Sequence, residues 1–347
     1  MPGIDIYSTH AQLAALELIP HEPQALLDLF VHNCGVTEDD EVIYDFMKGS
    51  QQMAPVVRKG TGGVLMGRDG YETKKVGFAT VAPERVVDVP VISERMFGER
   101  VFGAMTPAQR SKKLQAKDLV DMRRAIDRRK VYMAREVLFT GRLTLVEYTN
   151  AGRSATPRLV ADYGFTQNYS PDTVWDGVGA KVADDMKKMY EIVYDGLGVP
   201  EIMLMASDVG SAMLADEAYM KTMDYKHADL GEIKTRYTGQ GLRFIGRNAE
   251  GVEMYSSSLK IVGEDGTMIP LVPNGKAILG SRGMLNMYFG PVTQVEDPTK
   301  KEHTTYFKKE VPLRYADLND NAIKNRLTSC PTFVPKNVDG WVVANLL

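Results

Sequence analysis

Residues 105–141 have the sequence MTPAQRSKKLQAKDLVDMRRAIDRRKVYMAREVLFTG, which predicts one helix of unusual length. Apolar residues recur at intervals of three, four or seven positions, as expected for one buried helix face. These residues are Leu119, Met122, Ile126, Met133 and Val137. Pro107 suits the first turn of a helix, and Gly141 favours its end. The helix would be roughly 50 Å long, and a compact enzyme core seldom needs one of that length.

The same stretch is strongly basic. It holds ten Lys or Arg against four Asp or Glu, an excess of six positive charges, whereas the rest of the chain carries a net charge of −9. These charges could form an ordinary solvated helix face. Alternatively, the basic residues could face an acidic neighbouring chain or a polyanion. The residues concerned are Arg123, Arg124, Arg128, Arg129 and Lys130.

The composition is that of a folded chain. Its 347 residues suggest two domains or one elaborated domain, and 44% hydrophobic residues suffice for a buried core. The net charge of −3 offers no overall attraction to nucleic acid or to a membrane. Cys34 and Cys330 cannot build a disulfide framework, and neither a signal peptide nor an 18-residue apolar run is visible. We therefore expect synthesis in a reducing cytoplasm.

A glycine-rich segment, residues 54–91, precedes the long helix and predicts an extended two-stranded hairpin. Its glycines break any helix, and its valines favour strands. An Asp–Gly pair is a strong turn signal, so the tip is expected at residues 68–70. The segment has too few apolar residues for a core of its own, and a lone hairpin is marginally stable. It is therefore expected to rest on another surface.

Beyond the long helix the pattern changes to alternating helices and strands. A Ser–Pro pair predicts the start of a helix over residues 170–196. A buried strand is predicted at residues 202–205, followed by a second helix over residues 207–221. Turn signals separate short strands over residues 241–288. The apolar end of the chain is expected to return into a sheet, because free chain ends are usually polar and frayed.

Motifs for nucleotide or metal chemistry fail on inspection. Residues 62–69 approach the phosphate-loop pattern, but an Arg–Asp pair replaces the lysine and the hydroxyl that bind phosphate and magnesium. The five histidines lack the spacing of a zinc site. We therefore predict no cofactor, metal or catalytic residue. A soluble enzyme whose site combines dispersed groups such as Asp208, His227 and Arg236 is the alternative from another class.

The order of the segments resembles the fold of tailed-phage major capsid proteins: an arm, a glycine-rich hairpin, a long helix, a small α/β layer and further strands. More closely, the chain is similar to the lambda-like capsid E family over nearly its whole length, from about Leu26. The matching stretches are Ala54–Gly60, Glu94–Arg95, Phe102–Gly103, Ile126–Arg129, Met133–Ala134, Leu138–Gly141, Gly198–Met203, Ile269–Pro270, Ala277–Gly280, Tyr288–Val292 and Ser329–Asp339. One departure is that residues 307–312 lack the tryptophan that family members usually carry there.

The resemblance implies an α+β protein with the HK97-like capsid fold. In that fold an N-terminal arm, an extended β-hairpin loop, a peripheral domain with a long spine helix and an axial α/β domain follow one another. The implied divisions are 1–53 for the arm, 54–91 for the loop, 92–169 for the peripheral domain with its spine helix 105–141, 170–285 for the axial domain, and 286–347 for a return to the peripheral sheet.

The resemblance also implies a structural function. Many copies would form hexamers and pentamers of an icosahedral head around double-stranded DNA, in a virion assembled in the host cytoplasm. Expected partners are other copies, a scaffold, a portal, a decoration protein and non-specifically bound DNA, with no membrane. The residues expected at subunit contacts are Arg58, Lys59, Gly60, Arg68, Lys74, Lys75, Arg123, Arg124, Arg128 and Arg129. A bacterial compartment shell of the same fold, enclosing enzymes, is the nearer alternative.

Overall fold

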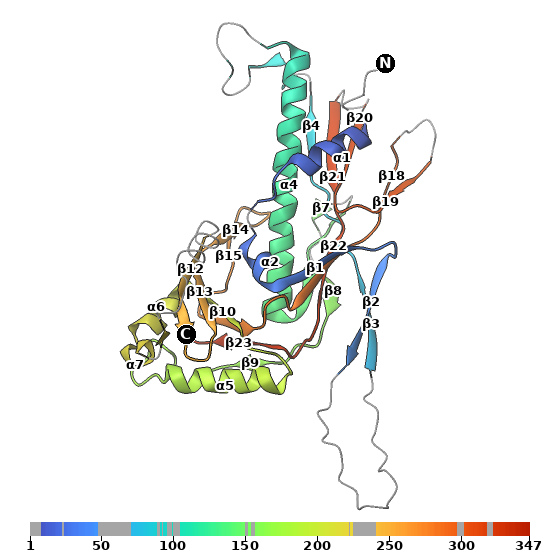
Figure 1. The fold of residues 1–347 in the computed structure, drawn as a ribbon. Coiled ribbons are helices and arrows are strands. Elements are labelled where there is room, and N and C mark those ends of the chain that lie inside the picture. Colours follow the sequence, from blue (N-terminus) through green and yellow to red (C-terminus); the bar gives the residue numbers. More distant parts are fainter. Residues whose placement is uncertain are drawn as a thin grey trace, which may run out of the picture.

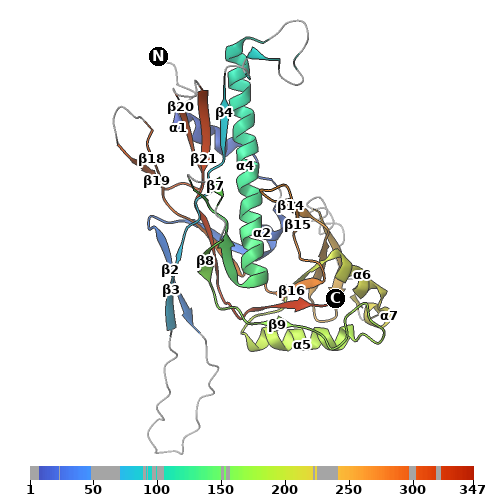
Figure 2. The same ribbon diagram turned by 180° about the vertical axis from the view of Figure 1, so that it is seen from behind.

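The computed structural model shows an elongated α+β fold built around one long helix, so the predicted fold class is confirmed (Figure 1). The residues that it describes are 8–22, 24–47, 71–88, 91, 93–95, 99, 105–149, 152–153, 157–221, 223–224, 241–296, 302–317 and 322–347. Helix α4, Pro107–Thr140, runs along most of the molecule. A large sheet with its helices lies at the C-terminal end of α4, and a small sheet lies beside its N-terminal half (Figures 1 and 2).

The ends of α4 are set by local chemistry, and the predicted roles of Pro107 in the first turn and of Gly141 at the end are confirmed. The hydroxyl of Thr106 accepts a hydrogen bond from the amide of Gln109, whose side chain accepts one from the amide of Thr106. Gly141 ends the helix in the left-handed region, at a φ of 65°. A side chain there would also collide with Phe165, whose Cβ would lie 2.1 Å away. All five residues of the predicted apolar face, from Leu119 to Val137, are buried.

A seven-stranded sheet forms the largest layer, in the order β11-β12-β13-β10-β16-β23-β9. Its strands are β9 (Asn168–Tyr169), β10 (Ile202–Ala206), β11 (Met223–Asp224), β12 (Leu242–Asn248), β13 (Glu253–Ser257), β16 (Lys276–Gly280) and β23 (Trp341–Asn345). The C-terminal strand β23 pairs antiparallel with β16. The chain end therefore returns into a sheet as predicted, but this sheet is the one formed by residues 170–285. The four buried residues of β23 suit an inner position. Residues 341–345 thus pair with a strand of the segment 170–285, and not with the other strands of 286–347.

Helices cover this sheet on one side, and the first of them starts later than predicted. Helix α5, Val182–Asp195, packs on β16 and β23, and α6, Ser207–Ala215, packs on β10 and β13. The short α7, Glu217–Met220, follows. The expected helix start at residue 170 is wrong, because residues 170–181 form turns that include Gly179 at a φ of 87°. Val174 and Val178 of the expected helix are exposed, and its first buried valine is Val182.

Smaller sheets lie along α4, beside both of its halves (Figures 1 and 2). One has the order β20-β21-β4, with β20 (Val311–Asp317), β21 (Ala322–Thr328) and β4 (Glu84–Val87). Another has the order β1-β17-β22, with β1 (Val31–Val36), β17 (Leu285–Phe289) and β22 (Pro331–Pro335). Helix α1, Thr9–Leu18, contacts β20, and α2, Ala25–Phe30, contacts α4. The remaining pairs are β5 (Arg142–Leu145) with β8 (Arg158–Asp162), β6 (Tyr148–Thr149) with β7 (Gly152–Arg153), β14 (Lys260–Val262) with β15 (Met268–Pro270), and β18 (Val292–Gln294) with β19 (Thr304–Tyr306).

The hairpin exists, but its predicted boundaries of 54–91 are wrong at both ends. Strand β2, Glu41–Met47, pairs antiparallel with β3, Tyr71–Gly77. The first strand thus lies within the predicted arm of residues 1–53. The last residues of the predicted hairpin, in β4, pair instead with β21, 235 or more positions along the chain. The predicted tip at residues 68–70 lies outside the described residues.

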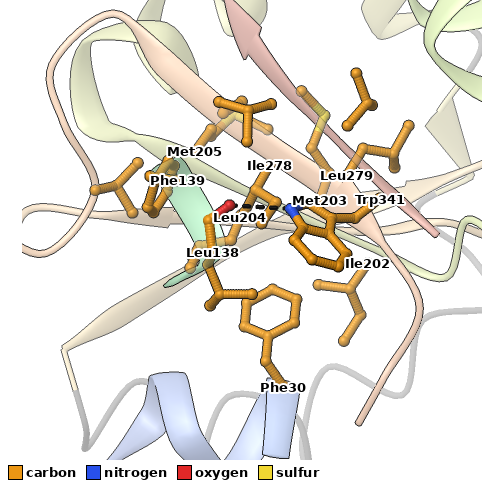
Figure 3. Close-up of a cluster of buried hydrophobic side chains, with 14 of the residues drawn as sticks. Phe30, Leu138, Phe139, Ile202, Met203, Leu204, Met205, Ile278, Leu279 and Trp341 are labelled. Atoms are coloured by element: carbon orange, nitrogen blue, oxygen red, sulfur yellow. Dashed lines mark hydrogen bonds between the residues drawn. The ribbon is translucent and has the colours of Figure 1, made fainter. Parts of the chain in front are cut away.

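The main hydrophobic core joins the end of α4 to the seven-stranded sheet and to α2. Trp341 is fully buried there, and its indole N–H donates a hydrogen bond of 2.9 Å to the carbonyl of Leu138 (Figure 3). Its ring also stacks on Phe165, with the ring centroids 4.8 Å apart. Phe30 of α2 and Ile202 of β10 lie in the same cluster (Figure 3). Within the described part of the chain, no helix combines the length and hydropathy needed to cross a membrane.

Candidate assembly surfaces

An ion network joins α4 to the segment after α1 and to the residue before β20. Its members are His21, Arg123, Asp127, Lys130 and Glu310. Lys130 Nζ lies 2.8 Å from Asp127 Oδ1 and 3.2 Å from Glu310 Oε1. Arg123 Nε lies 3.2 Å from Glu310 Oε2. All of these side chains except His21 are buried, so two buried cations face two buried anions and the charges balance.

Arg123 holds the C-terminal end of α1. Its guanidinium donates hydrogen bonds to the carbonyls of Leu16 and Ile19, and α1 has no basic residue of its own in its last turn. A cation at this end satisfies free carbonyls and complements the helix dipole. Arg123 Nη2 also lies 2.7 Å from His21 Nε2. The other ring nitrogen of His21, Nδ1, lies 3.2 Å from both carboxylate oxygens of Asp127.

Asp127 stays ionised within the network. Burial by itself raises the pKa of the Asp127 carboxyl, but Lys130, His21 and the amide of Glu22 outweigh it, and the pKa is lowered. One ligand atom each from His21, Asp127 and Glu310 lies within 4.8 Å of the others, which makes them a geometric candidate for a metal site. The ammonium group of Lys130, however, already contacts both carboxylates. The geometry therefore favours an ion network, in which Lys130 supplies the cation, over a metal site.

Replacing Arg123 with Lys is expected to loosen α1 more than the rest of the fold. Lysine keeps the charge but lacks the planar guanidinium, whose Nη1 bonds the two carbonyls at the end of α1 while Nε contacts Glu310 and Nη2 contacts His21. Hydrogen exchange should therefore quicken at least tenfold for the amides of residues 11–18 and little for those of α4. Arg128→Gln is the matched control, because the pair of Arg128 with Glu22 is half exposed. Equal exchange in both variants would contradict the capping role of Arg123.

The structure separates the four arginines of α4 that were expected at subunit contacts. Arg123 is buried and bound within its own chain, which leaves it no surface for a neighbouring chain or DNA. Arg128 and Arg129 form ion pairs of 2.9 Å with Glu22 and 2.7 Å with Glu264. Arg124 is exposed and has no ion-pair partner among the described residues. Of these four arginines, Arg124 is therefore the one that is most available for a contact with another subunit.

The residues expected at contacts made by the hairpin are only partly described. Lys74 and Lys75 lie on β3, opposite Tyr44 and Ile43 of β2. Lys74 is half-buried, whereas the Lys75 side chain is 63% exposed and lies 3.3 Å from Glu41. The other four predicted residues lie outside the described part of the chain. These are Arg58, Lys59, Gly60 and Arg68.

The residues of the enzyme alternative do not form a described site. Asp208 accepts hydrogen bonds of 2.8 Å from the amides of Val209 and Gly275, so it holds the start of α6 against a turn. His227 and Arg236 lie outside the described residues. A cavity of about 340 Å³ lies at the start of α5, and Asp208 is not among its lining residues. Its polar lining residues are Lys181, Asp184, Asp216 and Tyr219.

Sequence reasoning missed the ion network because nothing local marks it. Glu310 lies 180 positions from Lys130, and His21 lies 106 positions from Asp127. Lys130 was grouped with residues that could face a neighbour, yet it is buried. The spacing of Arg123, Asp127 and Lys130 on one side of α4 was the available signal, since it matches the apolar face.

Comparison with known proteins gives the family of the chain. Residues 8–342 match the family of phage major capsid protein E. No curated protein matches the sequence. Because the match spans almost the whole chain, it applies to the complete fold.

Solved structures agree with this fold. A prophage protein from E. coli CFT073, assigned as a capsid protein, has a TM-score of 0.70 and 15% identity, over 98% of this chain and 99% of that one. The mature capsid of bacteriophage PhiM1 has a TM-score of 0.49 and 10% identity, over 94% and 88%. The SrpI encapsulin complex from Synechococcus elongatus PCC 7942 has 0.44 and 11%, over 96% and 95%. Of these three, only the prophage protein has a TM-score above 0.5, and at 15% identity its similarity shows the fold alone.

The fold and the family match lead to one conclusion. The long helix, the hairpin and the mixed sheets follow one another as the resemblance implied, and the capsid fold of the prophage protein aligns with them from end to end. The chain therefore belongs to the phage major capsid protein E family and is a shell protein of the virion with an HK97-type capsid fold.

Proposed function

We propose that many copies of this chain assemble in the host cytoplasm into hexamers and pentamers, which close an icosahedral head around double-stranded DNA. The observation that carries the proposal is the family match over residues 8–342, which includes every layer of the fold. A scaffold, a portal and a decoration protein would be further partners of the shell. Binding energy in such a shell is spread over large surfaces between copies rather than held in one pocket.

The hairpin β2–β3 is the element best placed to contact a neighbouring copy. It projects from the body of the molecule (Figures 1 and 2). Its base is fixed, because Val76 is buried in the core and the ring of Tyr44 lies 5.8 Å from that of Tyr163. Ile43, by contrast, is 61% exposed. A two-stranded hairpin is marginally stable alone, so burial of its outer face against another copy would stabilise it.

Replacing Ile43 with Asp is expected to abolish assembly and to spare the folded chain. An exposed substitution of this kind changes the stability of a monomer by less than about 0.5 kcal/mol. At a contact between copies, by contrast, the new carboxylate would be buried without a partner, which costs much more free energy. The yield of closed shells, counted by electron microscopy and sedimentation, should fall at least tenfold. Ile43→Val, which keeps the apolar surface, should assemble normally. Normal shells from the Asp variant would exclude Ile43 from the contact.

The contents of the shell test the proposal against the compartment alternative. Electron microscopy of the purified protein over a range of concentrations should show closed shells. Shells isolated from infected or induced cells should protect double-stranded DNA from nuclease. Shells that carry an enzyme and no DNA would instead support a compartment shell, and a protein that stays monomeric at every concentration would contradict both.

A further inference from the structure

The basic residues of α4 fall into two sets. In the first set each residue has an acidic partner within the chain. Its members are Arg110 with Glu99, Arg123 with Glu310, Arg128 with Glu22, Arg129 with Glu264, Lys130 with Asp127, and Arg135 with Glu136. The second set is exposed and forms no ion pair with any described residue. It consists of Lys112, Lys113, Lys117 and Arg124.

Three residues of the second set share one face of the helix. At 100° per residue, Lys113, Lys117 and Arg124 fall within an arc of about 40°, which is more than 100° away from the core residue Leu119. They extend over about 16 Å of helix axis. We call these three residues the basic stripe. In Figure 2 no other labelled element crosses in front of the N-terminal half of α4.

Acidic residues near the basic stripe are already engaged elsewhere. Asp118 and Asp121 are the acids of this part of α4, and Arg85 of β4 lies 3.5 Å from the first and 3.4 Å from the second. Asp118 is buried, and burial raises its pKa above the ordinary value although Arg85 and Lys117 lower it. Lys117 therefore lowers the pKa of Asp118 but forms no ion pair with it. Within the described part of the chain, the basic stripe therefore has no acidic partner, and its positive charge is available to a group outside the chain.

The surroundings of the basic stripe suit a nucleic acid better than a protein. No large hydrophobic residue of α4 is among the exposed ones. Stable protein interfaces depend on apolar and aromatic anchors at their centre, which the described residues of α4 do not offer. Contacts with a phosphate backbone need only cations, and duplex DNA carries about one charge per 1.7 Å. A row of three cations over about 16 Å can therefore follow several phosphates.

We propose that the basic stripe binds the phosphate backbone of double-stranded DNA without sequence preference, and that this face of α4 is turned toward the interior of the shell. The orientation rests on the proposed function, whereas the binding itself does not. One copy would contribute few contacts. A closed shell presents the basic stripe many times, so weak contacts would add up to firm retention of the DNA.

The test uses the full chain with three substitutions, Lys113→Gln, Lys117→Gln and Arg124→Gln. Binding of unassembled protein to a linear duplex of random sequence is followed by fluorescence anisotropy at several salt concentrations. Three lost phosphate contacts should weaken binding at least tenfold at low salt and reduce the slope of log K against log salt by about 2–3. The matched control removes equal charge from exposed lysines elsewhere: Lys181→Gln, Lys187→Gln and Lys221→Gln.

Each outcome decides between explanations. Weaker binding and a smaller slope in the stripe variant alone support the proposal. Equal losses in both triple variants would mean that only the overall charge matters, which overturns it, as would unchanged binding. Shells are scored separately by electron microscopy. Failure of the wild-type chain to assemble would overturn the proposed function and leave DNA binding untouched. Loss of shells with DNA binding intact would assign the basic stripe to an acidic face of another protein.

Discussion

Replacing Glu310 with Gln is expected to lower the free energy of unfolding by about 3–5 kcal/mol, because it removes one of two anions from a buried and balanced network. Glu310 contacts both Arg123 and Lys130, and all three side chains are less than 10% exposed. In the variant, two buried cations would share the single carboxylate of Asp127. The penalty comes from leaving a buried charge without its partner, more than from the loss of the attraction itself.

Thermal and urea unfolding, followed by circular dichroism, measure this effect. A loss of that size should lower the melting temperature by about 5 °C in a chain of this length. Glu22→Gln is the matched control, since Glu22 pairs with Arg128 at the surface, where such pairs contribute at most about 1 kcal/mol. If both variants lose equal stability, the burial of the network has no energetic consequence and the interpretation is wrong.

Truncating Trp341 to Ala is expected to have an effect of similar size, a loss of about 3–5 kcal/mol. The ring is fully buried where strand β23 meets the end of α4, and it stacks on Phe165. Removal would leave a cavity between the seven-stranded sheet and the long helix. It would also leave the carbonyl of Leu138 without the indole donor (Figure 3).

Two further variants separate the contributions of packing and hydrogen bonding. Trp341→Phe keeps much of the ring but removes the N–H donor, and it should cost about 1–3 kcal/mol. Tyr194→Ala removes an aromatic ring that is 57% exposed and should change stability little. Far-UV circular dichroism should follow the unfolding, because the Trp341 variants lose one of only two tryptophans. A Trp341→Ala variant as stable as Tyr194→Ala would show that the C-terminal strand is not anchored by this residue.

The buried network also explains why a strongly basic helix can sit inside a folded chain. Three elements that are far apart in sequence meet at Arg123, Asp127, Lys130 and Glu310, and their charges cancel. The network fixes α1 and the strand β20 on α4 through polar groups, with only a small apolar cluster around Leu16 beneath them. Loss of one member should therefore loosen the arm as well as the helix.

The sequence by itself determined the features that depend on neighbouring residues. The length of α4 follows from its apolar spacing, from the capping pair Thr106 and Gln109, and from Gly141, all of which act within a turn or two. Strand β10 and the start of helix α6 follow from short local patterns in the same way, although the helix predicted over residues 207–221 ends at Ala215. The order of these segments was enough to suggest the family, which the match over residues 8–342 confirms.

Only the tertiary structure decided which strands pair and which charges meet. The hairpin boundary was wrong because an alternating apolar pattern marks a strand without naming its partner, and β4 found its partner in β21. The last strand joined the seven-stranded sheet for the same reason. Arg123 and Arg124 are adjacent in sequence, yet one is buried in the ion network and the other is exposed. Successive residues on a helix point about 100° apart, so their surroundings depend on which elements the whole fold places beside each face.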